Sequence, residues 1–377
     1  YFSDSGHYIV LTPGNFYEEG GFKRQAGKEK FYVGEIPKDY LHDKGDLIVA
    51  MTEQAVGLLG SCAVVPDANI YLHNQRLGLI TTAHKQLVRA FVYYLFQTKS
   101  VREQIRLSST GSKVKHTSPE RIYDVRAPLP NVNEQQKIAD VLSALDAKID
   151  CNNRINAELE AMTKTLYDYW FVQFDFPNAK GKPYKSSGGK MFYHPILKRE
   201  IPSGWSVTSI GEYADVKKGE LITASDAKAG NIKVVAAGVG FSYTHSDSNR
   251  DKNTITISGS GANAGLINFW REPIFASDCI TVRCKTDTQT LLLLHHLRFI
   301  QGHILRQATG SAQPHVYPSD IKILDYVIPN ATLIDNFGAT AIAMNDQIAN
   351  NIKEIQLLKR LRDWLLPMLM NGQVKVA

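Results

Sequence analysis

The chain has 377 residues, of which 44% are hydrophobic and 21% are charged, and its formal net charge is +6. This composition is typical of a globular protein, and the length leaves room for two domains. The apolar runs are too short to span a bilayer and no signal-peptide pattern opens the chain, so we predict a cytoplasmic protein without membrane contact.

Residues 1–109 combine short β-like runs with turn signals. The apolar run 46–51 predicts a buried strand, residues 77–80 predict another, and residues 87–107 predict an amphipathic helix. Loops rich in lysine and aromatic residues lie between these elements, and they carry the cations Lys23, Arg24, Lys28 and Lys30.

Residues 110–130 occur twice in the chain. The first copy reads T-G-S-K-V-K-H-T-S-P-E-R-I-Y-D-V-R-A-P-L-P, and the second, at 309–329, reads T-G-S-A-Q-P-H-V-Y-P-S-D-I-K-I-L-D-Y-V-I-P. Seven of the 21 positions are identical at a constant offset of 199 residues, against roughly one expected from average composition. The chain therefore contains an internal repeat, which decides its domain organisation.

A long helix with a heptad seam is predicted after each copy, because apolar residues recur at alternating steps of four and three. A lone helix with one apolar stripe is unstable in water, so we predict that the two helices pair. Antiparallel pairing would place the two domains at opposite ends of a rod. The seam positions are Ile138, Leu142, Leu145 and Ile149 in the first helix and Phe337, Ala341, Met344 and Ile348 in the second.

Asn152 and Asn351 occupy the next seam position of each helix. A polar residue in an apolar seam can specify register and orientation. Alternatively each asparagine lies slightly off the seam and is solvated, with Ile155 and Ile352 as core residues. Near the helix ends, Trp170, Trp364 and Leu365 are candidates either for the core or for anchoring partner helices.

Residues 173–205 are rich in Pro, Gly, Ser and Lys, which predicts a linker or surface loop that also begins the second repeat. Strand-like runs then resume at 255–257, 265–270 and 279–283, followed by a helix at 291–307. The domains and the linker are positively charged, whereas the first long helix is negative. We therefore predict these divisions: a first domain at 1–130, a helix at 131–172, the linker at 173–205, a second domain at 206–330 and a helix at 331–377.

Catalytic motifs are absent from the sequence. Residues 259–265 read G-S-G-A-N-A-G, but the spacing and the strand-like surroundings favour a tight turn over a dinucleotide loop. No phosphate-binding loop, amino-methyltransferase, nuclease or zinc-protease motif occurs. The adjacent pair His295 and His296 lacks metal-ligand spacing and favours surface or packing roles. The four cysteines show no C-x-x-C spacing, which favours reduced thiols.

The succession T-G-S…H-x-x-P…L-P…E-Q-Q-K-I-A-D-V-L-S-A-L-D-A-K-I resembles the specificity subunit of type I restriction-modification systems. So do F-D-F-P-N-A-K-G-K-P-Y-K-S-S-G-G-K-M at 174–191, I-P-S-G-W-S-V at 201–207 and L-R-D-W-L-L-P-M-L-M-N-G-Q at 361–373. Together they cover essentially the whole chain. The first domain has no counterpart of I-P-S-G-W-S-V, so comparison with this family predicts that its opening segment is lacking or was removed.

The resemblance implies an α+β protein with two α/β target-recognition domains, separated by two long antiparallel helices that form a coiled coil with a pseudo-twofold internal repeat. Each domain would read one half of a split double-stranded DNA target. Two methyltransferase subunits would dock on the helices, and restriction–translocase subunits would join them. This chain would then catalyse nothing and bind no cofactor, because S-adenosylmethionine, ATP and Mg belong to the partner subunits.

The T-G-S turns are the best shared candidates for phosphate contacts, because a glycine turn exposes backbone N–H groups. The alternative, compatible with the first, is that each turn caps the preceding helix. Base-reading candidates should differ between the domains, although each could equally be a solvated surface charge. The turn candidates are Ser112, Lys113, Lys115 and His116, with Ser311, Gln313 and His315; the base-reading candidates are Lys23, Arg24, Lys28 and Lys30, with Lys217, Lys218, Arg250 and Lys252.

Two other classes of protein remain as alternatives: a coiled-coil scaffold that joins two protein-binding modules, and a lone enzyme acting on DNA. The missing catalytic motifs argue against the enzyme, and salt-dependent DNA binding would separate a DNA reader from a scaffold. If the helices set the gap between half-sites, inserting four residues into each adds ~6 Å, close to two base steps of ~3.4 Å.

Overall fold

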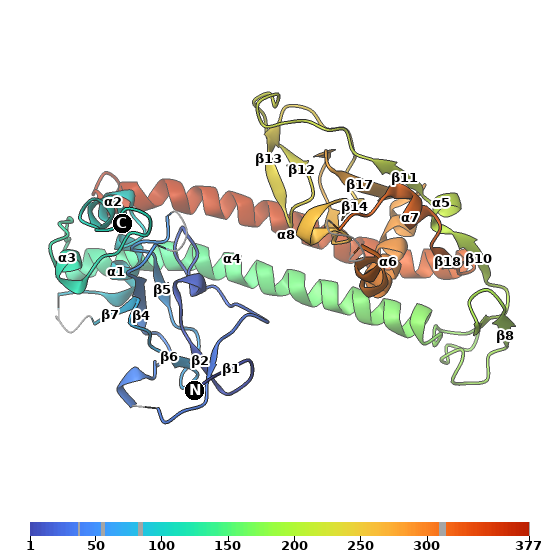
Figure 1. The fold of residues 1–377 in the computed structure, drawn as a ribbon, viewed down its shortest axis with the longest axis horizontal. Coiled ribbons are helices and arrows are strands. Elements are labelled where there is room, and N and C mark those ends of the chain that lie inside the picture. Colours follow the sequence, from blue (N-terminus) through green and yellow to red (C-terminus); the bar gives the residue numbers. More distant parts are fainter. Residues whose placement is uncertain (37, 54–56, 82–85, 309–313, 377) are drawn as a thin grey trace. The chain divides into compact units, whose positions relative to one another are not determined.

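The computed structural model describes residues 1–36, 38–53, 57–81, 86–308 and 314–376, which form two compact units (Figure 1). The first unit consists of Tyr1–Asp150 and Ile355–Ala377, and the second of Cys151–Glu354. Two long helices, α4 (Val132–Tyr167) and α8 (Ala331–Met370), each contribute to both units. The chain therefore passes between the units twice, both times inside a helix.

In its described residues, the first unit contains two small sheets and, besides its shares of α4 and α8, three short α-helices. One sheet has the order β1-β3-β2-β6, with β2 and β6 parallel, and the other is the antiparallel sheet β5-β4-β7. The strands are β1 (Phe2–Ser3), β2 (Tyr8–Val10), β3 (Phe31–Tyr32), β4 (Leu47–Ala50), β5 (Cys62–Val64), β6 (Tyr71–Leu72) and β7 (Leu77–Ile80), and the helices are α1 (Arg89–Leu95), α2 (Lys99–Leu107) and α3 (Pro119–Tyr123). The strands predicted at 46–51 and 77–80 are confirmed as β4 and β7.

The second unit has a four-stranded sheet β11-β17-β14-β15, a three-stranded sheet β13-β12-β16 and the strand pairs β10-β18 and β8-β9. Its strands are β8 (Met191–His194), β9 (Arg199–Pro202), β10 (Ser206–Ser209), β11 (Asp215–Lys218), β12 (Ile232–Val235), β13 (Phe241–His245), β14 (Thr254–Ser258), β15 (Ile267–Trp270), β16 (Ile274–Ala276), β17 (Cys279–Arg283) and β18 (Asp325–Ile328). Its helices are α5 (Ile210–Tyr213), α6 (Asp287–Ala308) and α7 (Pro318–Lys322). These bounds confirm the strands and the helix predicted between 255 and 307.

The internal repeat extends to the sheets. In each unit a fully buried central strand, β4 or β14, pairs antiparallel with two neighbours, giving β5-β4-β7 and β15-β14-β17. Each unit also has one parallel pair, β2 with β6 and β12 with β16. The second unit adds β11 beside β17, whereas among the described residues β7 is a sheet edge. The two domains therefore share this central three-stranded arrangement, which the second extends by β11.

The helix expected at 87–107 is interrupted, so its continuity was wrongly predicted. Thr98 lies between α1 and α2, with extended backbone angles of φ −68° and ψ 143°. Its hydroxyl donates to the Leu95 carbonyl at 2.7 Å and accepts from the Val101 N–H at 3.4 Å. These bonds end one helix and cap the next, which places the two helices separately against β4 and β5.

The linker predicted at 173–205 is wrong for much of its length. Phe174, Phe176 and Trp205 are buried in the core of the second unit. Phe176 stacks between Tyr184, at a centroid distance of 4.5 Å, and Trp205, at 5.4 Å. Only residues 177–190 form a largely exposed loop of turns, and β8 and β9 then make a hairpin. Aromatic residues spaced through a Gly- and Lys-rich sequence thus fold it onto the core.

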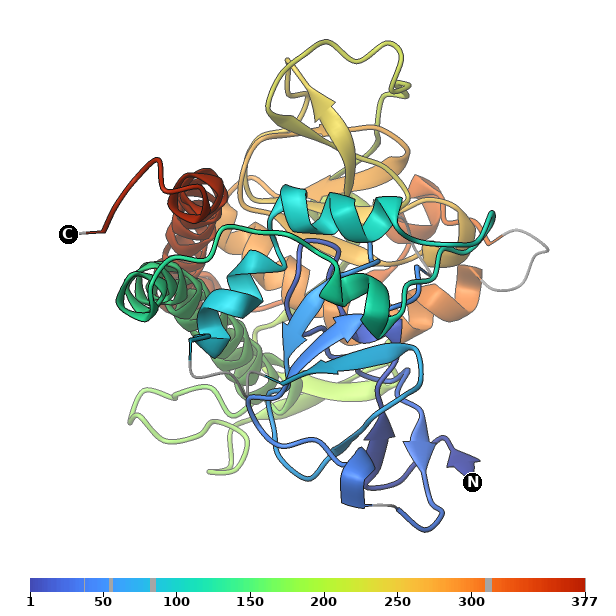
Figure 2. The ribbon, with the colours of Figure 1, turned by 90° about the vertical axis from the view of Figure 1, so that its left-hand side faces the viewer.

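Apolar contacts hold α4 and α8 together inside each unit. In the first unit, Ile138 and Leu142 of α4 cluster with Leu369 and Met370 of α8 and with Phe91 of α1. Figure 2 shows the two helices side by side there. In the second unit, the π-helical turn Asp168–Val172 extends α4 and packs Phe171 against Phe337 of α8. No described helix is long and apolar enough to cross a membrane.

Candidate nucleic-acid interface and helix seam

The first T-G-S turn is a closed loop that requires glycine. Gly111 has a φ of +101°, and a Cβ there would lie 2.0 Å from the Val114 carbonyl oxygen. The backbones of Thr110 and His116 exchange two hydrogen bonds, at 2.9 and 2.8 Å. Since α2 ends with Ser108 as its C-cap, the alternative in which Gly111 caps that helix is wrong. The turn presents three exposed candidates, Ser112, Lys113 and His116, with Lys115 half-buried.

Backbone pairing ties this turn to the segment that follows β4. Glu53 N–H donates to the Lys115 carbonyl at 2.9 Å, and Thr117 N–H donates to the Met51 carbonyl at 2.9 Å. The buried Thr52 hydroxyl lies 3.2 Å from His116 Nδ1. A turn fastened on both sides presents its lysines with little conformational freedom, which favours contact with regularly spaced phosphates.

The second copy is attached in the same way. Val316 N–H donates to the Gly259 carbonyl at 3.0 Å, and Gly261 N–H donates to the Pro314 carbonyl at 3.1 Å. His315 is exposed and stacks on Tyr317 at a centroid distance of 6.0 Å. The candidates Ser311 and Gln313 lie outside the described residues. The described part of the second copy is therefore fastened to the segment after β14 as the first copy is fastened to the segment after β4.

Sequence reasoning missed the segments that hold these loops. Residues 51–53 read M-T-E and residues 259–261 read G-S-G, so no residue identity relates them. The short 3-10 helix Gly261–Asn263 confirms the tight turn predicted there. Its backbone pairs with the second copy, and Ser260 Oγ donates to Asp278 Oδ2 at 2.9 Å. Only the pairing of the strands shows that residues 51–53 and 259–261 occupy equivalent positions, each directly after the central strand of its sheet.

The first-domain cations Lys23, Arg24, Lys28 and Lys30 are all exposed. Arg24 Nη2 lies 2.7 Å from Asp67 Oδ2, and the Lys23 ammonium lies 5.8 Å from the centre of the Tyr17 ring. Both contacts are on the surface, where an ion pair contributes little and exchanges readily for a phosphate. These cations therefore remain available to an anionic partner.

Three of the four second-domain cations are exposed as well. Lys217 and Lys218 lie on β11, and Lys252 precedes β14. Lys217 Nζ lies 2.6 Å from Asp215 Oδ2, two residues back on the same strand. The described residues of the first unit contain no counterpart of β11. Lys217 and Lys218 therefore distinguish the second domain from the first.

The structure argues against Arg250 as a base-reading residue, because its guanidinium is already bonded within the domain. Its guanidinium donates to Thr281 Oγ1 at 3.0 Å, to the Asn249 carbonyl at 2.7 Å and to the Lys218 carbonyl at 3.2 Å. It also lies 3.5 Å from Glu220 Oε1. A half-buried arginine with this many partners fastens β11 and β17 together, and a base edge would have to compete with all of them.

The predicted helix seam agrees with the burial of the side chains. The apolar seam residues and both asparagines are buried, apart from Leu145 and Met344, which are half-buried. Residue numbers fall along α8 as they rise along α4: in the second unit, Asn152 faces Glu354 and Thr163 faces Met344. In the first unit, Arg362 Nη1 donates to Asp146 Oδ1 at 2.8 Å. The pairing is therefore antiparallel, as predicted.

The two seam asparagines make bonds between the helices. Asn152 Nδ2 donates to Glu354 Oε2 and Asn351 Nδ2 donates to Asn156 Oδ1, both at 2.8 Å. Ile155 is 40% exposed, so the alternative of solvated asparagines replaced by isoleucine is wrong. A buried amide bonded in one register disfavours sliding of one helix along the other.

Exposed apolar side chains form one stripe on each long helix. Stripe A consists of Leu357, Leu361 and Trp364 on α8 in the first unit, and Trp364 is 55% exposed. Stripe B consists of Ile155, Met162 and Tyr169 in the second unit. Steps of three, four or seven place each set on one helix face. The sequence analysis named Trp364 but missed Leu357 and Leu361, although their helical spacing is visible in the sequence. The other two predicted anchors, Trp170 and Leu365, are half-buried in the cores.

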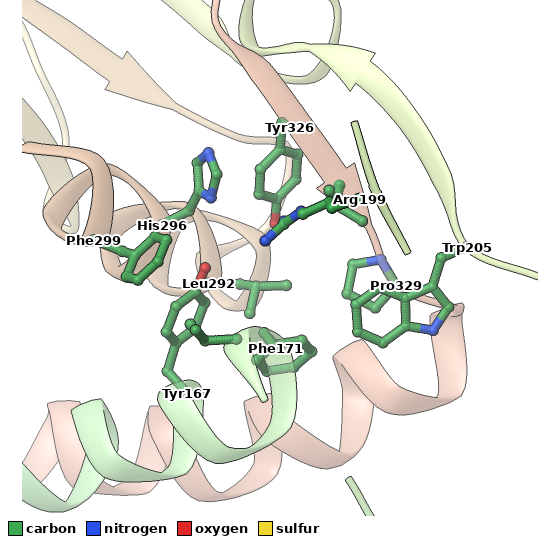
Figure 3. A pocket seen from close by; sticks show the side chains of 11 residues that line it. Tyr167, Phe171, Arg199, Trp205, Leu292, His296, Phe299, Tyr326 and Pro329 are labelled. Atoms are coloured by element: carbon green, nitrogen blue, oxygen red, sulfur yellow. The ribbon is translucent and has the colours of Figure 1, made fainter. Parts of the chain in front are cut away.

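The second unit encloses a pocket at the end of α4 that is almost filled by its own side chains (Figure 3). Tyr167, Trp205, His296 and Tyr326 line it, and its free volume of about 20 Å³ is close to that of one water molecule. Burial lowers the pKa of His296 to about 4. The volume is too small for a cofactor.

His295 has a packing role, as the sequence indicated. It is buried, and its ring stacks on Tyr167 at a centroid distance of 5.5 Å. Burial lowers the pKa of His295 to about 3, with the cations Arg298, Lys164 and Arg271 adding to the shift. Within the described residues, no group of His, Cys, Asp or Glu is arranged to hold a metal ion. Of the free cysteines, three are buried and Cys151 is half-buried.

Comparison with known proteins identifies a family that matches most of the chain. The family model for the type I restriction modification DNA specificity domain matches residues 2–161 and 202–354. The type I restriction enzyme MjaIX specificity subunit of Methanocaldococcus jannaschii is 28% identical over 311 residues, covering 77% of this chain and 70% of the relative. The HindI specificity subunit of Haemophilus influenzae is 28% identical over 120 residues, covering 31% of this chain and 26% of the relative.

A solved structure shares the fold. The crystal structure of the S subunit of a type I restriction-modification system from M. genitalium aligns with a TM-score of 0.56. The sequence identity is 18%, and the alignment covers 98% of this chain and 90% of the other. The two family matches fall on the two repeats, so the repeat found in the sequence is a property of the fold.

Proposed function

Because the chain belongs to the type I restriction modification DNA specificity family, in which it is the non-catalytic specificity subunit that recognises DNA sequence, we propose that each α/β domain reads one half of a bipartite target. The observation that carries this proposal is the pair of repeat-related turns. The first copy, and the second in its described part from Pro314 onward, are fastened by backbone bonds to the segment after a buried central strand. Shared turns supply the phosphate contacts common to both halves, and the cations that differ between the domains supply discrimination.

The proposed phosphate contacts are Ser112, Lys113, Lys115 and His116 in the first domain and Ser311, Gln313 and His315 in the second. Lys23, Arg24, Lys28 and Lys30 are proposed to read bases in the first domain, and Lys217, Lys218 and Lys252 in the second. Exposure of the described members, apart from the half-buried Lys115, supports this assignment. Only Arg250 leaves the set, because its donors already bond within the domain.

The experiment that tests DNA reading is methylation mapping in a host that carries this chain with its partner subunits. We expect methylation at a split motif with two unlike halves, and we expect it to disappear without the chain. In parallel, binding of the purified chain to duplex DNA should weaken steeply as salt rises, because phosphate contacts release counterions. If DNA binding does not depend on salt, and the host's methylation is the same with and without the chain, the coiled-coil scaffold is favoured instead.

We further propose that stripes A and B are the docking surfaces for two methyltransferase subunits, one on each long helix. Exposed apolar residues on one face of a helix are typical of helix-in-groove binding sites. The restriction–translocase subunits would join this assembly, which would function in the cytoplasm. Under this proposal the chain needs no cofactor of its own, and S-adenosylmethionine, ATP and Mg belong to the partners.

Replacing Trp364 by alanine tests stripe A. We expect the amount of methyltransferase co-purified with the chain to fall at least about tenfold, because buried tryptophans contribute strongly to interfaces. The melting temperature of the free chain should change little, since the side chain is exposed. Tyr123→Ala, which removes an exposed aromatic residue of α3, is the matched control and should leave co-purification unchanged.

A further inference from the structure

A three-way polar junction holds the first domain on its helices. Asp146 lies on α4, and its Oδ2 accepts a hydrogen bond from the Tyr94 hydroxyl of α1 at 2.8 Å. Its Oδ1 accepts from Arg362 Nη1 of α8 at 2.8 Å. Tyr94 is buried, and the Arg362 side chain is 19% exposed. One carboxylate therefore joins the domain and both long helices inside the first unit.

A second three-way junction does the same inside the second unit. Asn345 of α8 is buried, and its Oδ1 accepts from Arg271 Nε at 2.8 Å, while its Nδ2 donates to Asn253 Oδ1 at 3.1 Å. Arg271, in the turn after β15, also donates through Nη2 to Glu160 Oε1 of α4 at 2.8 Å. The domain, α4 and α8 again meet at one cluster of directional bonds.

The junctions occupy equivalent positions in the two repeats. Asp146 and Asn345 are separated by the same 199 residues that relate the T-G-S turns. Their domain partners are unrelated by that offset, since Tyr94 comes from a helix and Arg271 from a turn between strands. In both repeats this helix position bonds the domain. Asp146 also bonds the opposite helix directly, through Arg362, whereas in the second unit Arg271 makes that connection, through Glu160.

Directional bonds at such a junction restrict the orientation of a domain more tightly than apolar contacts do. Apolar packing tolerates small sliding motions, whereas a guanidinium that bonds two partners has one good geometry. Asn253 strengthens the second junction, because it is itself buried with a φ of +59° and donates to Asp287 Oδ2 at 2.9 Å. The junction therefore reaches from α8 through the domain to α6.

We propose that Asp146 and Asn345, with Tyr94 and Arg271, are positioning residues that set the orientation of each domain on the helix pair of its own unit. The orientation of a domain decides where its DNA half-site lies relative to a methyltransferase docked on the same helices. This last step rests on the proposed function, whereas the orientation itself does not. The residues act through geometry and touch neither DNA nor a reacting atom.

The test measures orientation directly in the full chain without DNA or partners. Spin labels are placed at Thr244→Cys on β13 and Lys353→Cys on α8, in a chain where the half-buried Cys151 is replaced by serine; both label sites are exposed. Arg271→Met removes both bonds of the guanidinium while keeping an apolar stem. We expect the distribution of label distances to broaden about twofold, because angular precision is lost at the junction.

Two further variants make the result decisive. Arg271→Lys keeps the charge but cannot reach Asn345 and Glu160 together, so its distance distribution should be of intermediate width. Lys164→Met removes an ion pair with Asp168 that stays within α4, and it should leave the distribution unchanged. A lowered melting temperature without broadening would overturn the proposal, because it would show that Arg271 only stabilises the fold.

A second arm connects orientation to methylation. In the assembled complex, Arg271→Met should slow methylation on the order of tenfold while DNA affinity changes less than about twofold, because misplacement affects the reaction more than binding. Equal loss of affinity and rate would overturn the positioning role in catalysis. If the complex carrying the original chain methylates nothing, the proposed function fails, and the label distances still decide whether the junction orients the domain.

Discussion

His295 shows what a buried, neutral imidazole contributes to stability. Its pKa of about 3 in the folded chain lies below the value near 6.5 of an unfolded chain. Between these values the unfolded state binds a proton that the folded state excludes, so stability falls as the pH decreases from about 6.5.

Replacement of His295 by phenylalanine should therefore flatten the acid side of the stability profile. The ring keeps its stack on Tyr167 but no longer takes up a proton when the chain unfolds. Between pH 6.5 and 4.5 the variant should lose about 2 kcal/mol less unfolding free energy than the original chain. Denaturant titrations at several pH values measure this, with the exposed His7→Phe as control. Identical profiles for the variant and the original chain would contradict the prediction.

Lys113 and Lys115 belong to the first T-G-S turn, and their replacement by alanine should weaken binding to every DNA sequence by a similar factor. Phosphate contacts carry no sequence information, so specificity should remain while the salt dependence of the binding constant becomes shallower by roughly one unit per lost contact. Binding titrations at four salt concentrations measure the slope. A change in the recognised sequence would assign these lysines to base reading instead.

Residue-level expectations succeeded where a local pattern decides the outcome. The glycine of the T-G-S turn, the buried seam and the packing role of His295 all follow from spacing or residue type. The bonds of Arg250 that argue against base reading could not be predicted, because its partners, Thr281 and the Lys218 carbonyl, come from strands β17 and β11. A lone sequence shows that an arginine is present, but not whether its donors are already used.

At the scale of elements, Thr98 is the residue that divides one amphipathic stretch into α1 and α2. Its replacement by alanine removes the bond to the Val101 N–H and the bond to the Leu95 carbonyl. We expect the unfolding free energy to fall by about 1 kcal/mol, which is typical for loss of an N-cap. Ser100→Ala, at an exposed position in α2, is the matched control for chemical denaturation and should not destabilise the chain.

The sequence pattern predicted best those strands that are buried at every position. β4 and β14 are buried along their whole length; β4 is an apolar run, and β14 is a β-branched run that ends in a serine. The segment 173–205 was misjudged because its Gly, Pro and Lys content outweighed the aromatic residues that pack in the core, chiefly Phe174, Phe176 and Trp205. Those residues pack only after distant parts of the chain, including Phe171 and Phe337, have come together.

At the scale of the whole molecule, both passages between the units lie inside helices, at residues 150–151 of α4 and 354–355 of α8. Insertion of four residues into each helix should lengthen this connection by ~6 Å, close to two base steps. We expect the spacer of the methylated motif to grow by about two base pairs while both half-sites keep their sequence. Methylation mapping measures this, and an unchanged spacer would show that the helices do not set the gap.

The division into units was only partly accessible from the sequence. The repeat predicted two domains and two helices in alternation, and the sheets β5-β4-β7 and β15-β14-β17 bear out that duplication. The partition of each helix between two units was not predicted, because it depends on contacts such as that of Asp146 with Arg362. No local pattern marks the residue at which a helix changes neighbours.

The shared helices also have a consequence for the order in which the newborn chain becomes native. Leu142 reaches its partners Leu369 and Met370 only after the ribosome has made the entire second unit. Cys151–Glu354, by contrast, is one uninterrupted stretch that can collapse as soon as it emerges. The apolar face of α4 around Leu142 must therefore wait for the end of the chain, whereas the clusters around β4, which draw only on residues 9–127, do not need α8.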